Sequence, residues 1–557
     1  MKKITPDTEY DYIIIGSGFG GSVSALRLSQ KGYKVLVIEK GQWFKESTYA
    51  ANAWNIRKWL WMPMMGLRGI MKLTVLNHVT VFSGVGVGGG SLTYGATLPT
   101  PKSKFFQSGS WGGLRNWEED LKPHYDEALR MLGATENPTL TEADFVIKDL
   151  AERLGKEDHF HPSRVAIHFA DPSQQGTYIS DPYFGGKGPA RRGCNQCGSC
   201  MTGCKNNAKN TLDKNYLYLA QQYGADILAE HEVTDLIPAR DKDGGEGYFV
   251  SYKSSKPYAI KKKKVSLTKG VIFSGGVLGT VPLLLKLKQT GSLPNLSDQV
   301  GADIRTNNET ITSVTSFNDD VNFAQGVSIG SVLHTDENSH LEPINQNSKS
   351  GLMKLITAPN VSGNNVLTRL LSFIKAWALS PKDNAKVLFS KDWGKKTIFL
   401  LFMQHLDSTL TFKRGFGGRL KSGLGNGPAP SRHIPESQSI TEEVEKIVNG
   451  KATTGLTEAV FGTPSTAHIL GGAVMGSDAN QGVIDDKCKV YGYKNLYVCD
   501  GSAVSANPGV NPSLSITAIS EWAMSNIPEK TGPEKKGPEK TGHSQPLIFK
   551  DAAKDSK

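Results

Sequence analysis

The stretch Tyr12-Ile-Ile-Ile-Gly16-Ser-Gly18-Phe-Gly-Gly21 carries the pattern that determines the fold. Its first part, Tyr12–Ile15, is continuously apolar, which is typical of a parallel strand buried on both faces. The glycines follow, and apolar residues then recur with helical spacing. Strand, glycine turn and helix in this order predict the start of an α/β domain with a Rossmann-like, mostly parallel sheet.

Glu39 completes the pattern of a dinucleotide-binding unit. It ends the second apolar run, Val35–Ile38, and follows Gly21 by 18 residues. In such a unit Gly16 allows the turn, Gly18 lets a pyrophosphate approach the backbone, and Gly21 lets the helix pack on the strand. The helix N-terminus faces the phosphates, and the acid accepts hydrogen bonds from ribose hydroxyls. The sequence therefore predicts a dinucleotide site.

A second glycine cluster, Gly84-Val-Gly86-Val-Gly-Gly-Gly90-Ser91-Leu-Thr-Tyr-Gly95, is denser than a nicotinamide site needs. Glycines leave the backbone bare, so a ligand can approach it closely. This cluster predicts a loop that lies against an extended, flat cofactor such as a flavin.

Composition and charge narrow the class of protein. Of the 557 residues, 38% are hydrophobic and 21% are charged, which is ordinary for a globular protein and excludes wholesale disorder. The net charge of +11 permits binding to nucleic acid, an anionic membrane or an anionic cofactor. No zinc-finger, helix-turn-helix or aromatic-plus-basic pattern accompanies the charge, so we expect no nucleic-acid partner.

The N-terminus gives no sign of export. Residues 1–11 are polar and lack the apolar stretch and cleavage pattern of a signal peptide. The chain also has no uninterrupted run of about 18 apolar residues that could span a bilayer. We therefore expect a soluble, cytoplasmic protein.

Residues 311–460 differ in character from the first part of the chain. Thr397–Phe402 and Thr409–Lys413 predict strands, and Val366–Leu379 predicts a helix that carries a tryptophan. These patterns predict a second domain, built on an antiparallel sheet with helices. Leu496–Val498 is again a short buried strand of the first kind.

Three motifs near the C-terminus complete the pattern: His468-Ile-Leu-Gly-Gly472, Asp500-Gly501-Ser502 and Gly509-Val-Asn511-Pro512. Together with the N-terminal glycines they resemble the glucose–methanol–choline (GMC) oxidoreductase family, which is FAD-dependent. The resemblance runs from about Tyr12 to Ile527. Gly86-Val-Gly-Gly-Gly-Ser-Leu92 and Ala208-Lys-Asn-Thr-Leu212 are most similar to the bacterial cholesterol oxidase-like branch.

The resemblance implies a discontinuous FAD-binding domain. A five-residue repeat that starts with Pro-Glu-Lys follows Ile527 and predicts a solvated linker. The expected ranges are 1–110, 205–310 and 461–527 for the FAD-binding domain, 111–204 for a cap with a cysteine-rich insertion, 311–460 for the substrate-binding domain, and 528–557 for a low-complexity tail.

The resemblance also implies a reaction, the oxidation of an alcohol with transfer of a hydride to flavin N5. His468 would face the flavin and orient or deprotonate the hydroxyl, and an imidazole suits this task at neutral pH. Asn511 would hydrogen-bond the substrate oxygen or lie at the flavin edge. Further cofactor contacts are implied at Gly86, Gly90, Ser91, Val233, Asp500 and Gly501.

Glu342, in His340-Leu-Glu342-Pro343, matches the base that moves a double bond in cholesterol oxidases. A carboxylate in a sterol-shaped cavity could pass a proton between ring carbons. A surface glutamate is the alternative. Better-known cholesterol oxidases have asparagine where this chain has Tyr94, which weakens the transfer of substrate identity.

Four cysteines, Cys194-x-x-Cys197-x-x-Cys200-x-x-x-Cys204, have the spacing of bacterial ferredoxins and predict a 4Fe-4S cluster as one interpretation. Lys205 stands where proline is usual, and in two-cluster ferredoxins the fourth cysteine ligates the other cluster. A zinc site, and metal-free thiols or a local disulfide, are the alternatives.

Residues 53–73 combine tryptophans and methionines with Arg57, Lys58 and Arg68. They predict a lid over an apolar ligand or a contact with a membrane surface, and ordinary core packing is the alternative.

Three functions remain open. The first is oxidation of a sterol or similar lipid alcohol, in steroid or lipid metabolism, with oxygen or another electron acceptor. The second is a dehydrogenase of another alcohol or polyol that passes electrons through the cysteines to an acceptor other than oxygen. The third is a flavin- or lipid-binding protein without turnover, which the joint presence of His468 and Asn511 disfavours.

Overall fold

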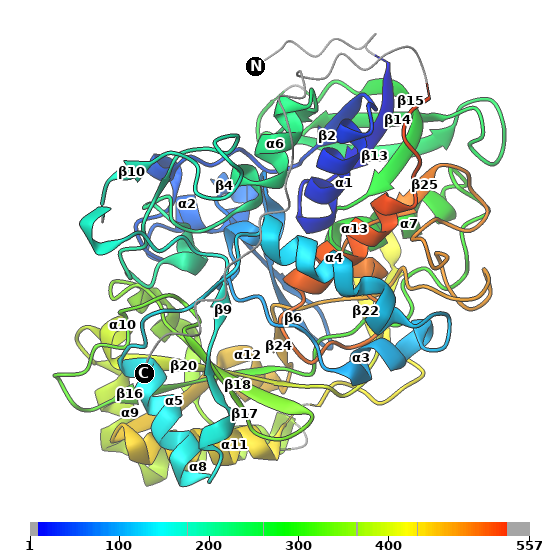
Figure 1. The fold of residues 1–557 in the computed structure, drawn as a ribbon. Coiled ribbons are helices and arrows are strands. Elements are labelled where there is room, and N and C mark those ends of the chain that lie inside the picture. The colour runs from blue at the N-terminus through cyan, green and yellow to red at the C-terminus, as the bar shows by residue number, and fades with distance from the viewer. Residues whose placement is uncertain are drawn as a thin grey trace.

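The structure, a computed structural model, describes residues 9–174, 176–259, 261–361, 363, 366–431 and 433–531. Its two large sheets lie in different halves of the molecule (Figure 1). The domain boundaries expected from the sequence stay predictions, although strands from all three ranges of the predicted FAD-binding domain meet in the first sheet.

The first sheet is built around β1 (Tyr10–Ile15), which pairs in parallel with β2 (Val35–Ile38) and β15 (Lys264–Phe273). All six residues of β1 are buried, as its continuous apolar run predicts. The other strands are β12 (Asp226–Leu228) and β25 (Leu496–Val498), both parallel, and β13 (His231–Pro238) and β14 (Tyr248–Ser254), which are antiparallel.

Helix α1 (Phe19–Gln30) packs closely on this sheet, between α6 (Tyr216–Gln222) and α13 (Ser513–Ser525). A Cβ atom on Gly20 would lie 1.7 Å from the carbonyl oxygen of Cys499, and one on Gly21 would lie 2.2 Å from that of Gly16. Only glycine fits at such distances. Helix α4 (Trp117–Met131) covers α13 from outside.

The second sheet is antiparallel, as expected for the substrate-binding domain. Its order is β19 (Thr357–Pro359), β23 (Gly450–Gly455), β16 (Thr310–Ser316), β20 (Thr397–Gln404), β18 (Ser339–Ile344), β17 (Ser331–His334) and β8 (Phe160–Pro162). Strand β8 comes from the range predicted as a cap.

Side chains alternate between the two faces of this sheet, as the pleat of a strand requires. Leu341, Ile398 and Leu400 pack in one core with α5 (Glu142–Arg153) and α11 (Pro435–Ile447). Ile344, Phe399 and Leu401 lie on the opposite face and line the cavity described below. The sheet therefore forms the floor of that cavity.

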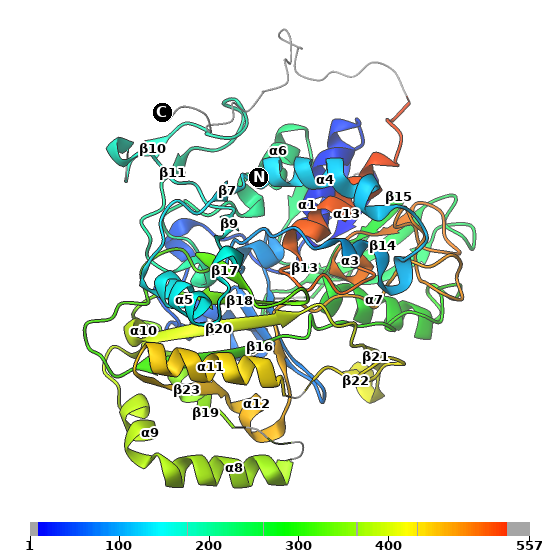
Figure 2. The same ribbon diagram turned by 60° about the horizontal axis from the view of Figure 1, so that its bottom comes forward.

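Smaller elements surround the cavity. Strands β5 (Met71–Val75) and β6 (Thr80–Gly84) form a hairpin, and β6 pairs with β24 (Ser465–Thr466) just before His468. A second hairpin consists of β21 (Leu410–Arg414) and β22 (Leu420–Leu424). Helices α8 (Val366–Leu379), α9 (Pro381–Leu388) and α12 (Leu456–Phe461) lie at the edge of the second domain (Figure 2).

The chain's last described residues return to the first sheet. The backbone N–H of Lys530 donates to the carbonyl of Lys31 at 3.0 Å, and its ammonium donates to Asp11 at 2.6 Å. The start of the predicted linker is thus exposed but attached, and residues 532–557 lie outside the described part. Among the described helices, none is long and apolar enough to cross a membrane.

Candidate active site

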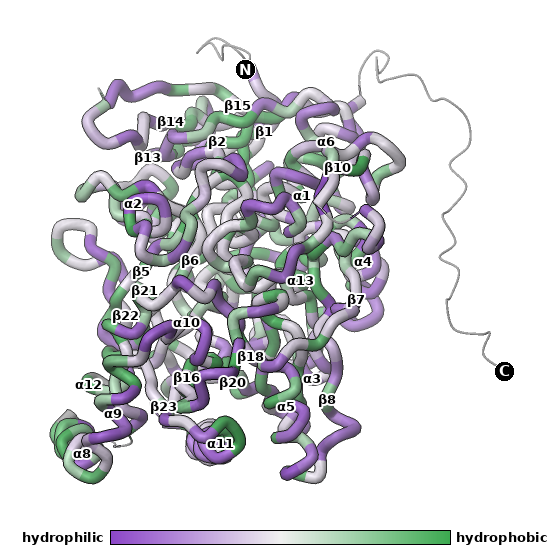
Figure 3. The backbone as a smooth tube through the Cα atoms, turned by 90° about the vertical axis from the view of Figure 1, so that its left-hand side faces the viewer, coloured by the Kyte–Doolittle hydropathy of each residue, from purple (hydrophilic) through white to green (hydrophobic). Residues whose placement is uncertain are grey.

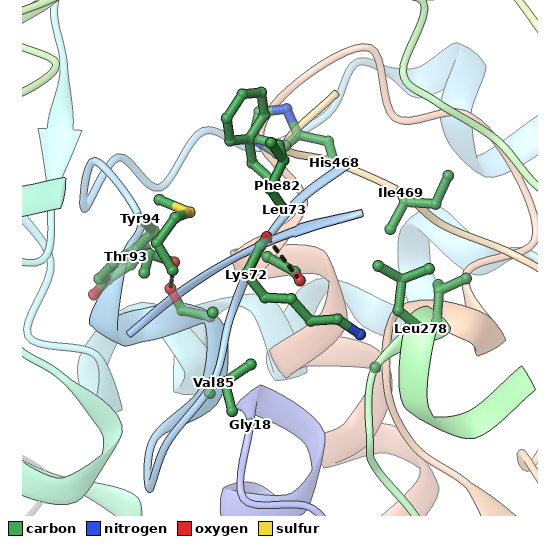
Figure 4. A pocket seen from close by; sticks show the side chains of 18 of the residues that line it. Gly18, Lys72, Leu73, Phe82, Val85, Thr93, Tyr94, Leu278, His468 and Ile469 are labelled. Carbon is green, nitrogen blue, oxygen red and sulfur yellow. Dashed lines mark hydrogen bonds between the residues drawn. The ribbon is translucent and has the colours of Figure 1, made fainter. Parts of the chain in front are cut away.

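A cavity of about 930 Å³ lies between the glycine loops of the first domain and the floor of the second sheet (Figure 4). Gly18 and His468 appear on opposite sides of it in the close-up. The residues predicted for the site that line the cavity are Gly16, Gly18, Glu39, Gly90, Val233, His468, Asp500, Gly501 and Asn511. Gly21, Gly86, Ser91 and Glu342 do not line it.

The end of the cavity at Gly18 fits a phosphate group. A Cβ atom on Gly18 would meet only the carbonyl oxygen of Ser274, at 4.0 Å, so protein packing does not require glycine there. Gly18 is the N-cap residue of helix α1, which has no side-chain cap and no acidic residue in its first turn. Its N-terminal N–H groups and dipole therefore favour an anion in the space that a Gly18 side chain would fill.

Glu39 is buried and holds the glycine loop in place. Its carboxylate accepts hydrogen bonds from the backbone N–H groups of Ser17 at 3.1 Å and Gly41 at 2.7 Å. Its own carbonyl accepts from His231 at the start of β13, which brings Val233 to the same end of the cavity. Glu39 and Val233, both predicted as cofactor contacts, thus lie together.

Asp500 connects two turns at the cavity wall. Its carboxylate accepts hydrogen bonds from the backbone N–H groups of Ser502 and Gly276, both at 2.8 Å, and from the hydroxyl of Thr280 at 2.5 Å. Burial raises the pKa of this carboxyl group, although the hydrogen bonds oppose the shift. Asp500 positions the backbone of Gly501 and Gly276 along the cavity.

The three small residues that do not line the cavity shape the loops behind it. Ser91 donates to the carbonyl of Gly88 at 2.7 Å and accepts from the N–H of Leu212 at 3.1 Å. Gly86 has a φ of +142°, and a Cβ atom there would collide with Leu92. In the structure, Gly86, Ser91 and Gly21 position the loops behind the cavity and do not line it.

His468 forms a buried pair that the sequence did not reveal. Its Nδ1 lies 2.5 Å from Oε2 of Glu309, whose other carboxylate oxygen accepts the N–H of Ala467. The Glu309 side chain has no exposed surface. Because Nδ1 is hydrogen-bonded to the carboxylate, Nε2 is the nitrogen that can act on a ligand in the cavity.

The surroundings of His468 raise the pKa of its imidazole above the ordinary value. Burial alone would lower the pKa, but the charge and hydrogen bond of Glu309 outweigh burial, and the charge of Glu342 adds to them. A histidine held in this way is a stronger proton acceptor than a free one.

Asn511 and Glu342 form a second buried pair. Nδ2 of Asn511 donates to Oε2 of Glu342 at 3.1 Å, and Oδ1 of Asn511 has no hydrogen-bond partner among the described residues. Glu342 is 1% exposed, which excludes the surface alternative. Nε2 of His340 lies 3.6 Å from its other oxygen. Glu342 thus stands behind Asn511, which is the member that lines the cavity.

One part of the cavity wall is apolar. Ile329, Ile344, Met353, Phe399 and Leu401 line it. Such a wall suits a rigid hydrocarbon skeleton, because binding removes apolar surface of both the wall and the ligand from contact with water.

Comparison with known proteins agrees with this geometry. Two models of the family "GMC oxidoreductase" match residues 190–303 and 435–520, and a model "FAD dependent oxidoreductase" matches residues 11–161. A cholesterol oxidase of Acinetobacter baumannii is 43% identical over 531 residues, which cover 94% of this chain and 95% of that protein. A cholesterol oxidase of Mycobacterium tuberculosis is 40% identical over 534 residues, with 94% and 92% covered.

The chain belongs to the GMC oxidoreductase family. It is an FAD-dependent oxidoreductase, which confirms the predicted fold class and cofactor. The crystal structure of pyridoxine 4-oxidase from Mesorbium loti has the same fold, with a TM-score of 0.58 and 14% identity over 93% of this chain and 98% of that one.

The cysteines of this GMC oxidoreductase give the iron–sulfur prediction no structural support. Among the described residues, no three His, Cys, Asp or Glu side chains are placed to hold a metal ion, and all described cysteines are free thiols. Burial raises the pKa of Cys194 and of Cys200.

A buried lysine next to the cysteines was also missed. The ammonium of Lys209 donates to the carbonyls of Cys200 at 2.7 Å, Leu92 at 3.0 Å and Tyr94 at 3.3 Å. Burial lowers its pKa to about 8. In this GMC oxidoreductase Lys209 therefore attaches the cysteine loop to the glycine-rich loop, and Tyr94 lines the cavity beside it.

Proposed function

We propose that this GMC oxidoreductase oxidises the hydroxyl group of a sterol or a similar lipid alcohol. The observation that carries the proposal is the position of His468 and Asn511 on the wall of an apolar cavity whose other end fits the phosphates of FAD. The similarity to two cholesterol oxidases over more than nine tenths of the chain supports the substrate class.

FAD, when bound, supplies the acceptor for the hydride that leaves the alcohol carbon. Nε2 of His468 accepts the hydroxyl proton, and Glu309 stabilises the imidazolium that forms. Asn511 has a second N–H on Nδ2, beyond the one given to Glu342, which can donate to the alcohol oxygen. The residues thus orient the alcohol and remove its proton, while the apolar wall excludes water.

Three finer points belong to the same proposal. Oxygen is the electron acceptor, as the name of the relatives suggests for them. Glu342 moves a double bond after oxidation, for which Asn511 must turn aside, because Glu342 does not line the cavity. The segment 53–73 contacts a membrane, where a lipid alcohol is found.

The proposal is tested by mixing the purified yellow holoprotein with cholesterol in detergent micelles without oxygen. We expect the flavin absorbance to bleach, and oxygen added afterwards to restore it with formation of hydrogen peroxide. Bleaching by short polyols but not by cholesterol would favour the dehydrogenase alternative. Lack of bleaching by any alcohol would contradict an enzymatic function.

A further inference from the structure

One cation on the cavity wall has no counter-charge in the protein. Lys72, the second residue of β5, lines the cavity, and Figure 4 shows its side chain extending into it. Its ammonium makes no hydrogen bond or ion pair with any described residue. Burial lowers the pKa of Lys72 to about 8, and the charge of Lys40 adds to this effect. An anion in the cavity would therefore stabilise the charged form of Lys72.

The residues around Lys72 supply no carboxylate. The sequence has no aspartate or glutamate from 47 to 117, a range that contains β5, β6 and the glycine-rich loop, residues 84–95. Glu39 lines the same cavity, but its carboxylate accepts the N–H groups of Ser17 and Gly41. The charge of Glu232 acts on the pKa of Lys72 more weakly than burial or Lys40 does. The counter-charge must come from a ligand.

Backbone pairing fixes the position of Lys72 relative to the glycine-rich loop. Lys72 lies opposite Ser83 in the hairpin β5–β6, and the N–H of Val85 donates to the carbonyl of Ile70 at 2.8 Å. In Figure 3 this hairpin lies between α2 (Ile56–Trp59) and the hairpin β21–β22. Lys72 is thus held on a paired strand at the point where the glycine-rich loop begins.

The glycine-rich loop in turn lies against the turn at Gly18. A Cβ atom on Gly89 would lie 2.6 Å from Cα of Gly18, and the N–H of Gly88 donates to the hydroxyl of Ser17 at 3.2 Å. Gly18 is where an anion fits the N-terminus of α1. One continuous set of backbone contacts therefore connects Lys72 to the anion site at Gly18.

Other cations on the cavity wall have partners in the protein. Lys286 and Arg414 donate to a backbone carbonyl and to a side-chain amide oxygen, both at 2.5 Å. Lys253 lies opposite Glu232 in the ladder of β13 and β14. Lys40 lines the cavity without such a partner, and the experiment below distinguishes it from Lys72.

We propose that Lys72 binds the pyrophosphate of FAD and completes the anion site that the N-terminus of α1 begins. The pyrophosphate is the charged group of oxidised FAD, and an ammonium donates strong, charge-assisted hydrogen bonds to phosphate oxygens. The phosphates supply the counter-charge that the protein lacks. The inference concerns the cofactor and does not depend on which alcohol is oxidised, so it and the proposed function can fail separately.

Retention of FAD by the holoprotein tests the proposal without turnover. Serial dilution followed by ultrafiltration gives the dissociation constant of FAD from the flavin fluorescence of the filtrate. Lys72→Met should raise this constant about 10–100-fold at pH 7, because hydrogen bonds between charged groups are lost. Lys72→Arg should stay within about threefold of the parent, since a guanidinium also binds phosphate.

Lys122→Met is the matched control for the loss of one positive charge. Lys122 is exposed on α4 and does not line the cavity. Its dissociation constant for FAD should equal that of the parent. Circular dichroism of each variant verifies that it is folded.

The pH dependence of the dissociation constant identifies the group that binds. Below pH 8 the ammonium of Lys72 is present with or without FAD. Above pH 8 the protein must take up a proton when FAD binds, so the constant of the parent should rise about tenfold from pH 7 to pH 9. Lys72→Met and Lys72→Arg should lose this rise, whereas Lys40→Met should keep it. Any titration of His468, whose pKa is also raised, is common to the parent and these variants.

ADP shows which part of FAD Lys72 contacts, because it carries a pyrophosphate but no flavin. The concentration of ADP that displaces FAD gives its own affinity, which should fall in Lys72→Met by the same factor as that of FAD. An unchanged affinity for ADP, equal retention of FAD by Lys72→Met and the parent, or a pH dependence that Lys40→Met loses and Lys72→Met keeps would each overturn the proposal. Retention of FAD as expected, without flavin reduction by any sterol, would contradict the proposed substrate alone.

Discussion

Glu309 and His468, 159 residues apart in the chain, meet with 2.5 Å between Oε2 and Nδ1. The carboxylate is fully buried, and the imidazole lines the cavity. This contact selects the tautomer of His468 and directs Nε2 toward the ligand. It also raises the pKa of the imidazole against the effect of burial, so it prepares His468 to accept a proton.

Glu309→Gln should shift the pH profile of turnover. The neutral imidazole is the active form, so activity rises with pH through the raised pKa of His468. Without the carboxylate, burial dominates and lowers that pKa, so the acid limb of kcat/KM should move to lower pH. The rate at the optimum should also fall, by about 10–100-fold, because the imidazolium loses its counter-ion.

An acid limb at the same pH in Glu309→Gln and the parent would show that Glu309 does not control the titration of His468. Thr310→Val is a suitable control, since Thr310 follows Glu309 but donates to Glu458 instead.

Gly18→Val should fold but fail to retain FAD. Its Cβ has room in the protein, and it would occupy the space assigned to the pyrophosphate. Gly16→Val should fail to fold, because a Cβ there would lie 2.3 Å from the carbonyl of Ser274. Absorbance after gel filtration reports the flavin, and circular dichroism reports folding. A fully yellow Gly18→Val protein would place the cofactor elsewhere.

Glu342→Gln distinguishes two roles of Glu342, as the base that moves the double bond and as the hydrogen-bond partner that positions Asn511. As a base it would be needed only for movement of the double bond, so the variant should oxidise cholesterol near the parent rate and release the unconjugated ketone. The amide can still accept the hydrogen bond of Asn511. Chromatography of the products at short times distinguishes the ketones. A conjugated product formed at the parent rate would show that Glu342 is not the base and only positions Asn511.

The glycine pattern predicted much of the fold, because Gly16, Gly20 and Gly21 stand where a side chain would collide with neighbouring backbone, and their spacing is visible in the sequence. The run of apolar and β-branched residues in Thr397–Phe402 likewise predicted a strand, which is β20 in the structure. These are short-range properties, and the structure confirms them.

The buried pairs could not be predicted in the same way. Glu309 reaches His468, and Asn511 reaches Glu342, across the boundary between the two sheets, and no local periodicity reports such contacts. A weak signal existed for Glu309. It follows Asn307 and Asn308, and asparagine adopts positive φ more readily than most residues, as both do here, so the sequence could have indicated a tight turn just before Glu309.

The cysteine pattern is a local spacing that no three-dimensional arrangement supports, since no group of side chains among the described residues is placed to hold a metal ion. We expect no iron or acid-labile sulfide above trace amounts in protein purified without oxygen, and a spectrum of flavin alone. Cys197→Ser, at the exposed cysteine, should keep full activity. About four iron and four sulfide atoms per chain, the content of a 4Fe-4S centre, would instead support the cluster if both were lost in Cys197→Ser.

The central claim is that His468 removes the hydroxyl proton, and the reduction of bound flavin by cholesterol without oxygen tests it most directly. Stopped-flow absorbance isolates this step from any later transfer of electrons. His468→Ala should bind FAD normally and be reduced about 10²–10⁴-fold more slowly than the parent. His468→Gln should match Ala if proton removal dominates, and exceed it if orientation dominates. Reduction of His468→Ala at the parent rate would contradict the account.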